Sequence, residues 1–270
     1  NGSMAGSNWS NWVPLAAVNG MSKFFGLFYF GGTDMFKFGT KEGEYIGFND
    51  PRLTIASDAF TGSDDGFGGQ NISVNVTGWY TVIMSVSIKG TDYAFTLDIA
   101  PGEVCLIGNA IGDWTFGDKG KFQAPTTADA DFVSPVCTGG GELRMSVKVP
   151  GEDWWRTEFA IPNGKIVFRE NKSVIDSWSE IGPEYAINVK AGQKINLNFV
   201  DYMKIEQNFD RAEDGTRQLL NESITTEFKL VDNSDGIYAK RDVYYRNYQY
   251  EPDDKALQAF RKPEKVIEET

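Results

Sequence analysis

Hydrophobic and polar residues alternate in short segments along most of the chain, and helical periodicity is almost absent. In the clearest segment, Leu143–Val149, every odd-numbered residue is large and apolar, whereas the even-numbered residues are Arg144, Ser146 and Lys148. This alternation predicts a half-buried strand. Further strands, separated by Gly, Pro, Asn and Asp turns, are expected at Phe24–Phe30, Met35–Phe38, Ile72–Val76, Trp79–Ile88, Tyr93–Ile99, Val104–Ile107, Lys165–Phe168, Tyr185–Val189, Lys194–Val200 and Tyr202–Ile205.

Sequence landmarks of the first part of the chain return in the same order about one domain later. Gly6–Trp12 has a counterpart in Gly108–Trp114, and both are glycine-started loops that reach a tryptophan. Thr33–Phe38 matches Gly140–Met145, with a basic residue between two large apolar ones. Short strands in two similar copies predict an all-β chain of tandem β-sandwich domains. Shorter matches join Val74–Gly78 to Ile187–Gly192 and Asp92–Tyr93 to Asp201–Tyr202.

The repeat divides the chain into a first module at residues 4–101, a second at 102–207 and an unassigned segment at 208–270. Little linker separates the modules, so we expect them to sit end to end rather than swing freely. The unassigned segment does not match a third copy. Its tyrosine-rich stretch Ile237–Tyr250 is expected to be an edge strand packed on the second module, with a second sugar surface as the alternative. Asp253–Arg261 is expected to form a short helix.

Charge and composition argue against several classes of protein. The formal net charge of −12 argues against a nucleic-acid partner, because phosphate binding requires clustered Lys and Arg. The chain has no run of about 18 apolar residues, so no membrane-spanning helix is expected. Histidine is absent, which removes every Ser-His or Cys-His nucleophile and every His-ligated metal site.

The cysteines and the clustered aspartates show no metal-binding spacing. Cys105 and Cys137 could form a disulfide or act as small buried hydrophobic residues, and the second interpretation is favoured. Asp58, Asp64 and Asp65 lie near one glycine-rich loop, but they lack the regular ligand spacing of a calcium loop. We therefore predict no metal and no cofactor.

The segment Gly141–Phe159 holds the strongest candidate for a binding site. After its strand, a Pro-Gly turn leads into Asp153, Trp154, Trp155 and Arg156. Adjacent side chains of an extended backbone point to opposite faces, so the core is expected to take only one of the two indoles. An exposed indole beside charged hydrogen-bonding groups suits a sugar, whose C–H face stacks on the ring. The alternative is a core Trp next to a partly covered Trp at an edge.

The order of these residues resembles a known family. The second copy resembles the tandem carbohydrate-binding modules of the SusE and SusF outer-membrane lipoproteins. The resemblance rests on Val104–Gly108 followed by Trp114, then Leu143–Met145 followed by the tryptophan pair, then Tyr185–Val189. The resemblance covers about residues 4–207 and is one of pattern rather than of a strict motif. It implies immunoglobulin-like β-sandwiches at the surface of Gram-negative gut bacteria, lipid-anchored upstream of this sequence. These modules hold polysaccharide without cutting it, as part of an outer-membrane glycan-uptake complex.

The resemblance also implies site residues in each copy. The ligand platform of the second module would be Trp114 with Trp154 or Trp155, and the hydroxyl donors would be Arg144, Lys119 and Arg156. The corresponding residues of the first module would be Trp9 or Trp12, Tyr45 and Lys37. Because one tyrosine stands where the second copy has a tryptophan pair, we expect the first site to be weaker, altered or absent.

Two other functions remain open at this stage. A glycoside hydrolase needs two carboxylates that flank the scissile bond, but Glu152, Asp153 and Glu158 lie on one segment and no second segment is marked as their partner. A surface adhesin or structural protein could use the same aromatic residues for protein contacts. The basic residue kept in both copies, Lys37 and Arg144, favours a repeating ligand. We therefore predict a non-catalytic protein that binds a polysaccharide or oligosaccharide.

Overall fold

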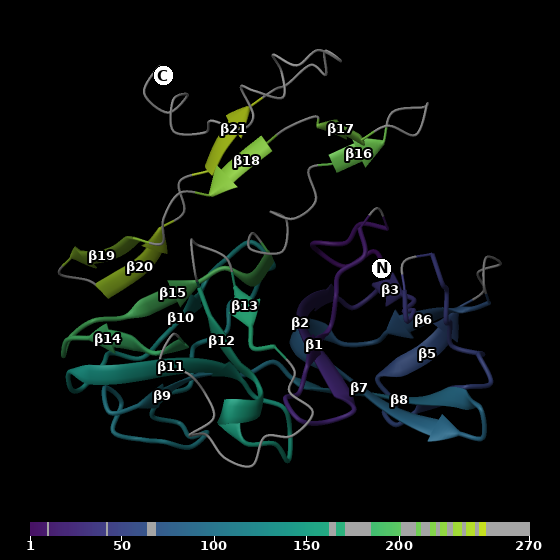
Figure 1. The fold of residues 1–270 in the computed structure, drawn as a ribbon, viewed down its shortest axis with the longest axis horizontal. Coiled ribbons are helices and arrows are strands. Elements are labelled where there is room, and N and C mark those ends of the chain that lie inside the picture. The colour runs from purple at the N-terminus through teal and green to yellow at the C-terminus, as the bar shows by residue number, and fades with distance from the viewer. Residues whose placement is uncertain are drawn as a thin grey trace.

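The computed structural model describes residues 1–200 except residues 10, 42, 64–68, 162–165 and 171–184, and beyond residue 200 only the backbone of strands β16 to β21. The structure is all β, as the alternating pattern predicts, and the two halves of the chain lie next to each other (Figure 1). Within this described part, no helix is long and apolar enough to cross a membrane.

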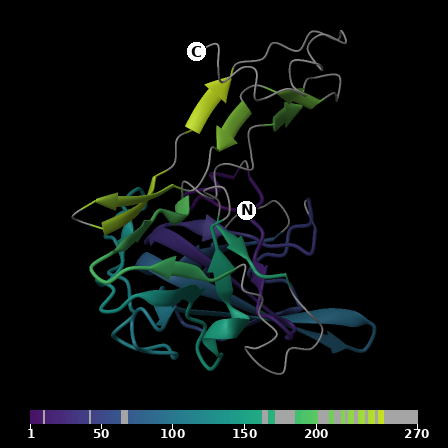
Figure 2. The ribbon, with the colours of Figure 1, turned by 60° about the vertical axis from the view of Figure 1, so that its left-hand side comes forward.

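The first half forms a sandwich of one large and one small sheet. In the large sheet, β4 runs parallel to β8 and the other neighbours are antiparallel. Its order is β1 (Ala16–Ala17), β2 (Lys23–Gly31), β7 (Thr77–Lys89), β8 (Asp92–Pro101) and β4 (Leu53–Ile55). The small sheet has the order β3 (Met35–Phe36), β6 (Asn71–Val74) and β5 (Phe60–Ser63). The β7–β8 hairpin extends from the body of the molecule (Figure 2).

The second half repeats the sandwich with β11 at the centre of its main sheet. The strand pairs with β9 on one edge and with β12 and β14 on the other. The main sheet contains β13 (Val167–Phe168), β12 (Glu158–Ala160), β11 (Gly141–Val147), β14 (Ile187–Val189) and β9 (Val104–Gly108). The facing sheet has the order β10 (Phe132–Val133), β15 (Ile195–Leu197), β20 (Gly236–Lys240) and β19 (Lys229–Asn233).

The C-terminal segment contributes strands beyond the sequence repeat. β20 pairs in parallel with β15 of the second module through Ile195↔Ile237 and Asn196↔Tyr238. Two further antiparallel pairs lie in the same segment. They join β16 (Phe209–Arg211) to β17 (Arg217–Leu219) and β18 (Glu222–Thr225) to β21 (Val243–Arg246). The expected strand at 202–205 and helix at 253–261 lie outside the described residues.

The large sheet of the first module is buried on both faces. On β2, Phe28 and Phe30 face the core of the first module, whereas Phe25 and Leu27 face a core built mainly by the second module. Buried strands of this kind carry continuous hydrophobic runs instead of alternation. The expected end-to-end arrangement is therefore wrong, because the second module packs against a face of this sheet. Strand β7 divides its side chains in the same way, with Trp79 and Ile83 on one side and Val82 and Met84 on the other.

Trp79 is the central residue of the contact between the modules. Its ring lies 4.9 Å from Phe132 and 6.3 Å from Phe199, measured between centroids, and its Nε1 donates to the carbonyl of Thr127 at 3.3 Å. Aromatic rings in such edge-to-face contacts add to the stabilisation that their burial supplies. Through this contact, residues of both modules share one hydrophobic core.

Both cysteines are free and buried, which confirms the prediction of small buried hydrophobic residues. Burial raises the pKa of the Cys105 thiol to about 11 and also raises the pKa of Cys137. A thiol with a raised pKa and no solvent access stays protonated and unreactive at neutral pH.

Candidate functional site

An aromatic cluster covers the outer face of the main sheet of the second module. Alternate residues of β9 point away from the core, and Cys105 and Ile107 form the base of the cluster on this face. Trp154 is buried against them, with Trp114, Phe116 and Trp155 packed around it. We call these four residues, Trp114, Phe116, Trp154 and Trp155, the second aromatic cluster.

The adjacent tryptophans of this cluster are buried to different extents. They lie in the short 3-10 helix η1 (Trp154–Arg156), where Trp154 is 6% exposed and Trp155 is half-buried. The unequal burial confirms the expectation that only one indole would be taken into the interior. Trp154 packs on the outer face of the sheet, however, and does not belong to the main core.

Arg156 joins the second aromatic cluster to the first module. Its guanidinium lies over the ring of Trp155, with Cζ 4.3 Å from the ring centroid. Its Nη1 donates to the carbonyl of Asn19 at 2.5 Å, and the backbone N–H of Asn19 donates back to the carbonyl of Arg156 at 2.9 Å. Arg156 therefore holds the Trp155 ring in place and also bridges the two modules.

Trp114 is held in a fixed orientation at the rim of the cluster. Its Nε1 donates to Oδ1 of Asn109 at 3.0 Å, and its ring lies 5.8 Å from that of Trp154 at an interplanar angle of 50°. Sequence reasoning did not identify Asn109 or Phe116. The sequence could have indicated Asn109, because it follows Gly108 in the repeated loop. A short amide side chain at that position can reach the indole of Trp114, which ends the loop.

Arg144 lies beneath the cluster, in an interior ion-pair network. Its side chain is 5% exposed, with Nε donating to Glu142 at 2.7 Å and Nη1 donating to Glu158 at 2.9 Å. Nη1 of Arg169 lies 3.7 Å from the second oxygen of Glu158. The hydrogen bonds from the guanidinium to the carboxylates raise the pKa of Arg144 above its ordinary value, although burial acts in the opposite direction.

The half-burial predicted for the strand of Arg144 is therefore wrong. The polar face is also covered, because η1 folds over it and the hydroxyl of Ser146 donates to the carbonyl of Trp154 at 2.8 Å. The donors of Arg144 point to carboxylates and support the cluster from below. Lys119, by contrast, is exposed, and lies close enough to Asp113 to help lower the pKa of that carboxyl, after the stronger effect of hydrogen bonds from Thr115.

The carboxylates weighed for hydrolysis do not form a catalytic pair. Glu158 is fully buried in its pair with Arg144, and Glu152 forms an ion pair with Lys23 of the first module. Asp153 is exposed at the start of η1. Among the residues that the structure describes, no group of three or more His, Cys, Asp or Glu side chains could hold a metal.

The first module repeats the aromatic geometry with different residues. The rings of Trp12 and Tyr45 lie 5.4 Å apart at an interplanar angle of 50°, close to the 5.8 Å and 50° of Trp114 and Trp154. We call Trp12 and Tyr45 the first aromatic pair. Trp9 lies elsewhere on the same loop, 40% exposed and with a left-handed φ of 58°.

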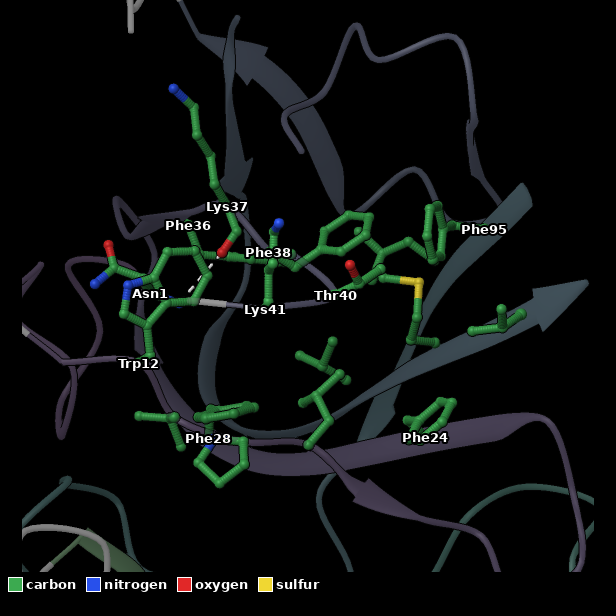
Figure 3. A pocket seen from close by; sticks show the side chains of 18 of the residues that line it. Asn1, Trp12, Phe24, Phe28, Phe36, Lys37, Phe38, Thr40, Lys41 and Phe95 are labelled. Atoms are coloured by element: carbon green, nitrogen blue, oxygen red, sulfur yellow. Dashed lines mark hydrogen bonds between the residues drawn. The ribbon is translucent and has the colours of Figure 1, made fainter. Parts of the chain in front are cut away.

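A cavity of about 690 Å³ lies beside the first aromatic pair (Figure 3). Trp12 lines it, together with Lys37 from the end of β3, which is 3% exposed and corresponds to Arg144 in the repeat. Most of the remaining wall is apolar and comes from β2, β7 and β8.

The described part of the chain consists of tandem β-sandwiches that carry aromatic clusters, the architecture expected of carbohydrate-binding modules. The sequence profile of the SusF/SusE starch-specific CBMs matches residues 1–96 and 103–211, and the chain belongs to this family. The resemblance expected from the sequence is confirmed.

One relative and one solved structure show how far the similarity extends. Outer membrane protein SusF of Bacteroides thetaiotaomicron is 34% identical over 197 residues, which is 70% of this chain and 37% of that protein. The crystal structure of SusF from Bacteroides thetaiotaomicron matches with a TM-score of 0.56 at 29% identity, over 80% of this chain and 46% of that chain. The chain thus spans less than half the length of these two relatives.

Proposed function

We propose that the chain binds a neutral, starch-like polysaccharide without cutting it, mainly through the second aromatic cluster. One observation carries this proposal: an aromatic pair with nearly the same spacing and the same 50° tilt recurs in both modules on different residues. Both pairs lie on matching segments of the sequence repeat, Trp12 in one loop and Trp114 in the other. A ligand that repeats along its length gains avidity from two such sites on one chain.

The geometry of the second cluster suits a sugar chain. Trp154 is the buried base, while Trp114 and Trp155 keep part of each ring at the surface. A partly exposed indole can stack on the C–H face of a pyranose. The hydrogen bond from Trp114 to Asn109 lowers the entropic cost of binding, because that ring is ordered before the ligand arrives.

The cellular setting follows from the family. The matched profile describes starch-specific modules, and the curated relative is an outer-membrane protein. We therefore place this chain at the bacterial cell surface, lipid-anchored upstream of this sequence, as part of an outer-membrane glycan-uptake complex. A catalytic role is disfavoured because Glu158 is held between two arginines and is shielded from any ligand.

Removing one exposed ring of the second cluster should weaken glycan binding without unfolding the protein. For Trp114→Ala and Trp155→Ala we expect a loss of about 1–2 kcal/mol, roughly five- to thirtyfold in Kd, because each ring supplies one stacking face. Affinity electrophoresis on gels that contain soluble starch would measure the retention of each variant. The melting temperature of each variant should stay within a few degrees of that of the unaltered chain.

Matched variants in the first module rank the two sites and test the choice of Trp12. Trp12→Ala should reduce retention less than Trp114→Ala. The ring that pairs with Trp12 is the phenol of Tyr45, which offers a smaller stacking face than an indole, so the first site is expected to be the weaker one. Trp9→Ala should not change retention, because the ring that pairs with Tyr45 is that of Trp12. Equal losses for Trp9→Ala and Trp12→Ala would contradict the assignment, and full retention by both second-cluster variants would overturn the proposal.

Affinity for a neutral glycan should depend little on salt or pH. Stacking and hydrogen bonds to hydroxyls pair no full charges across the interface, and screening acts on charge–charge attraction. The chain has no histidine, so no side chain with an ordinary pKa between about pH 5 and 8 can titrate in the site. Titration calorimetry between low salt and roughly 0.5 M salt would test this expectation. A tenfold fall in affinity would favour an acidic ligand or a protein partner that pairs with surface lysines or arginines.

A further inference from the structure

The cavity of the first module has a mostly apolar lining that it shares with the first aromatic pair only through Trp12. Its floor is the face of β2 and β7 that carries Phe24, Phe28 and Val86, and Phe38 closes it from the opposite side (Figure 3). Its volume of about 690 Å³ lies within the range of about 300–1,000 Å³ in which proteins hold small molecules. The space is therefore large enough for an organic ligand.

The cavity exists because the two sheets of this sandwich differ in size. The small sheet has strands of 2 to 4 residues, whereas β2 and β7 have 9 and 13. The small sheet can cover only part of the larger one, and the space left over the aromatic floor forms the cavity, although Phe28 itself is only 4% exposed. At the rim, Tyr93 is 56% exposed and lies opposite Ile88, which is 75% exposed, on the β7–β8 hairpin. An apolar surface thus continues from the cavity to the tip of the hairpin.

The charged residues that line the cavity are all basic. Lys37 and Lys41 contribute to the wall, and none of the described lining residues is acidic. Both lysines lie on the side opposite the floor of Phe24 and Phe28, and their Nζ atoms point away from it (Figure 3). Lys41 is exposed whereas Lys37 is buried, so Lys41 is the positive side chain that an anion at the mouth of the cavity would meet.

We propose that this cavity binds an anionic amphiphile, with the apolar tail on the phenylalanine floor and a carboxylate or similar head beside Lys41. Sugars need several hydrogen-bonding groups, and this wall offers few besides Thr40 and the lysines. An apolar tail removes the phenylalanine surface from water, which is the dominant favourable contribution for such walls. The site is separate from the second aromatic cluster and goes beyond the glycan-binding function.

Titration calorimetry of the full chain with dodecanoate, near pH 8 and below the concentration at which it forms micelles, tests the site directly. At that pH the carboxylate and the lysines are both charged, since their ordinary pKa values are about 4 and 10. We expect saturable binding of one molecule per chain. Dodecylammonium, with the same tail and the opposite charge, should bind at least about tenfold more weakly because its head is repelled by the lysines.

Two variants separate the tail contact from the head contact. Val86→Trp places a large side chain on the floor and should abolish binding of dodecanoate. Lys41→Glu should weaken binding about three- to tenfold, whereas Lys190→Glu, an equal change of charge on an exposed turn of the second module, should not.

Each possible result of these experiments either supports or overturns the proposal. Absence of saturable binding, equal binding of dodecanoate and dodecylammonium, or unchanged binding by a Val86→Trp variant that melts normally would each overturn the proposal. Should Val86→Trp fail to fold, the comparison of the two head groups on the unaltered chain still decides. Starch retention through the second cluster is a separate measurement, so either proposal can fail without the other.

Discussion

Trp154→Ala will lower the free energy of unfolding by about 3–5 kcal/mol, the range observed when a large buried aromatic side chain is truncated. The indole is 6% exposed and packs on Cys105 and Ile107, so its removal leaves a cavity over the outer face of the sheet. Trp155→Ala, one residue further on, should change stability by less than about 1 kcal/mol because that ring is only partly buried. Urea titrations of the three proteins would measure the difference.

The contrast between the two adjacent positions is the internal control for this prediction. Both variants remove the same atoms from the same short helix, so a difference in stability reports the environment of each ring. Trp154→Phe should recover most of the loss, because it refills part of the space with an aromatic ring. Equal midpoints for Trp154→Ala and Trp155→Ala would show that the buried base of the cluster does not stabilise the fold.

Local pattern was sufficient to predict the longer strands, but it was not sufficient to predict what covers them. The alternation of Leu143–Val149 correctly predicted β11, and its apolar face is buried in the main core. The burial of Arg144 and Ser146 on the other face depends on η1, which folds back over the strand. A return of this kind is set by tertiary contacts, and no residue period within the strand records it.

The continuous hydrophobic run of β2 could also have predicted that both faces of its sheet are covered. Phe24–Phe30 has apolar residues on both faces, which is the pattern of a strand with cover on both sides. That pattern predicts that a second layer packs on the sheet, which is the contact that the second module makes. Short strands such as β4 and β5 escaped prediction because three or four residues contain too little pattern to separate from a loop.

The candidate site was predictable as far as the repeat extends. Matching the two loops placed Trp114 with the Trp154 segment and either Trp9 or Trp12 with Tyr45. Ring contacts join Trp114 to Trp154 and Trp12 to Tyr45. The repeat could not choose between Trp9 and Trp12, because two tryptophans share one loop. It also could not show that Arg156 reaches across to the first module, since that contact joins residues far apart in the sequence. The module boundaries and the ligand contacts themselves remain predictions.

The basic residue that stands in the same place in both copies is buried in each of them. Lys37, which follows β3, is 3% exposed and Arg144, on β11, is 4% exposed. In the second module the buried ion-pair network fixes the strand on which the Trp154 loop rests, through Glu142 and Glu158. Its contribution to binding is therefore indirect: it supports the surface that meets the sugar.

Replacing the central carboxylate of that network should destabilise the protein about as much as losing Trp154. Glu158 is fully buried, 2.9 Å from Arg144 and 3.7 Å from Arg169, whose side chains are each 5% exposed. Glu158→Ala would leave two guanidinium groups in the interior without this carboxylate, and breaking a buried pair in this way costs about 3–5 kcal/mol. Denaturant titration at constant pH would measure the loss.

A surface carboxylate with two cations provides the matched control. Glu103 lies 2.9 Å from both Lys121 and Lys148, but the three side chains are 22%, 44% and 41% exposed. Solvent screens such pairs, so Glu103→Ala should cost no more than about 1 kcal/mol. The double variant Glu158→Leu with Arg144→Met should be less destabilised than the sum of its single changes, because it removes the charge together with its partner. If Glu158→Ala proved no more costly than Glu103→Ala, the network would contribute nothing beyond an ordinary surface pair, and support of the aromatic cluster would have to come from packing alone.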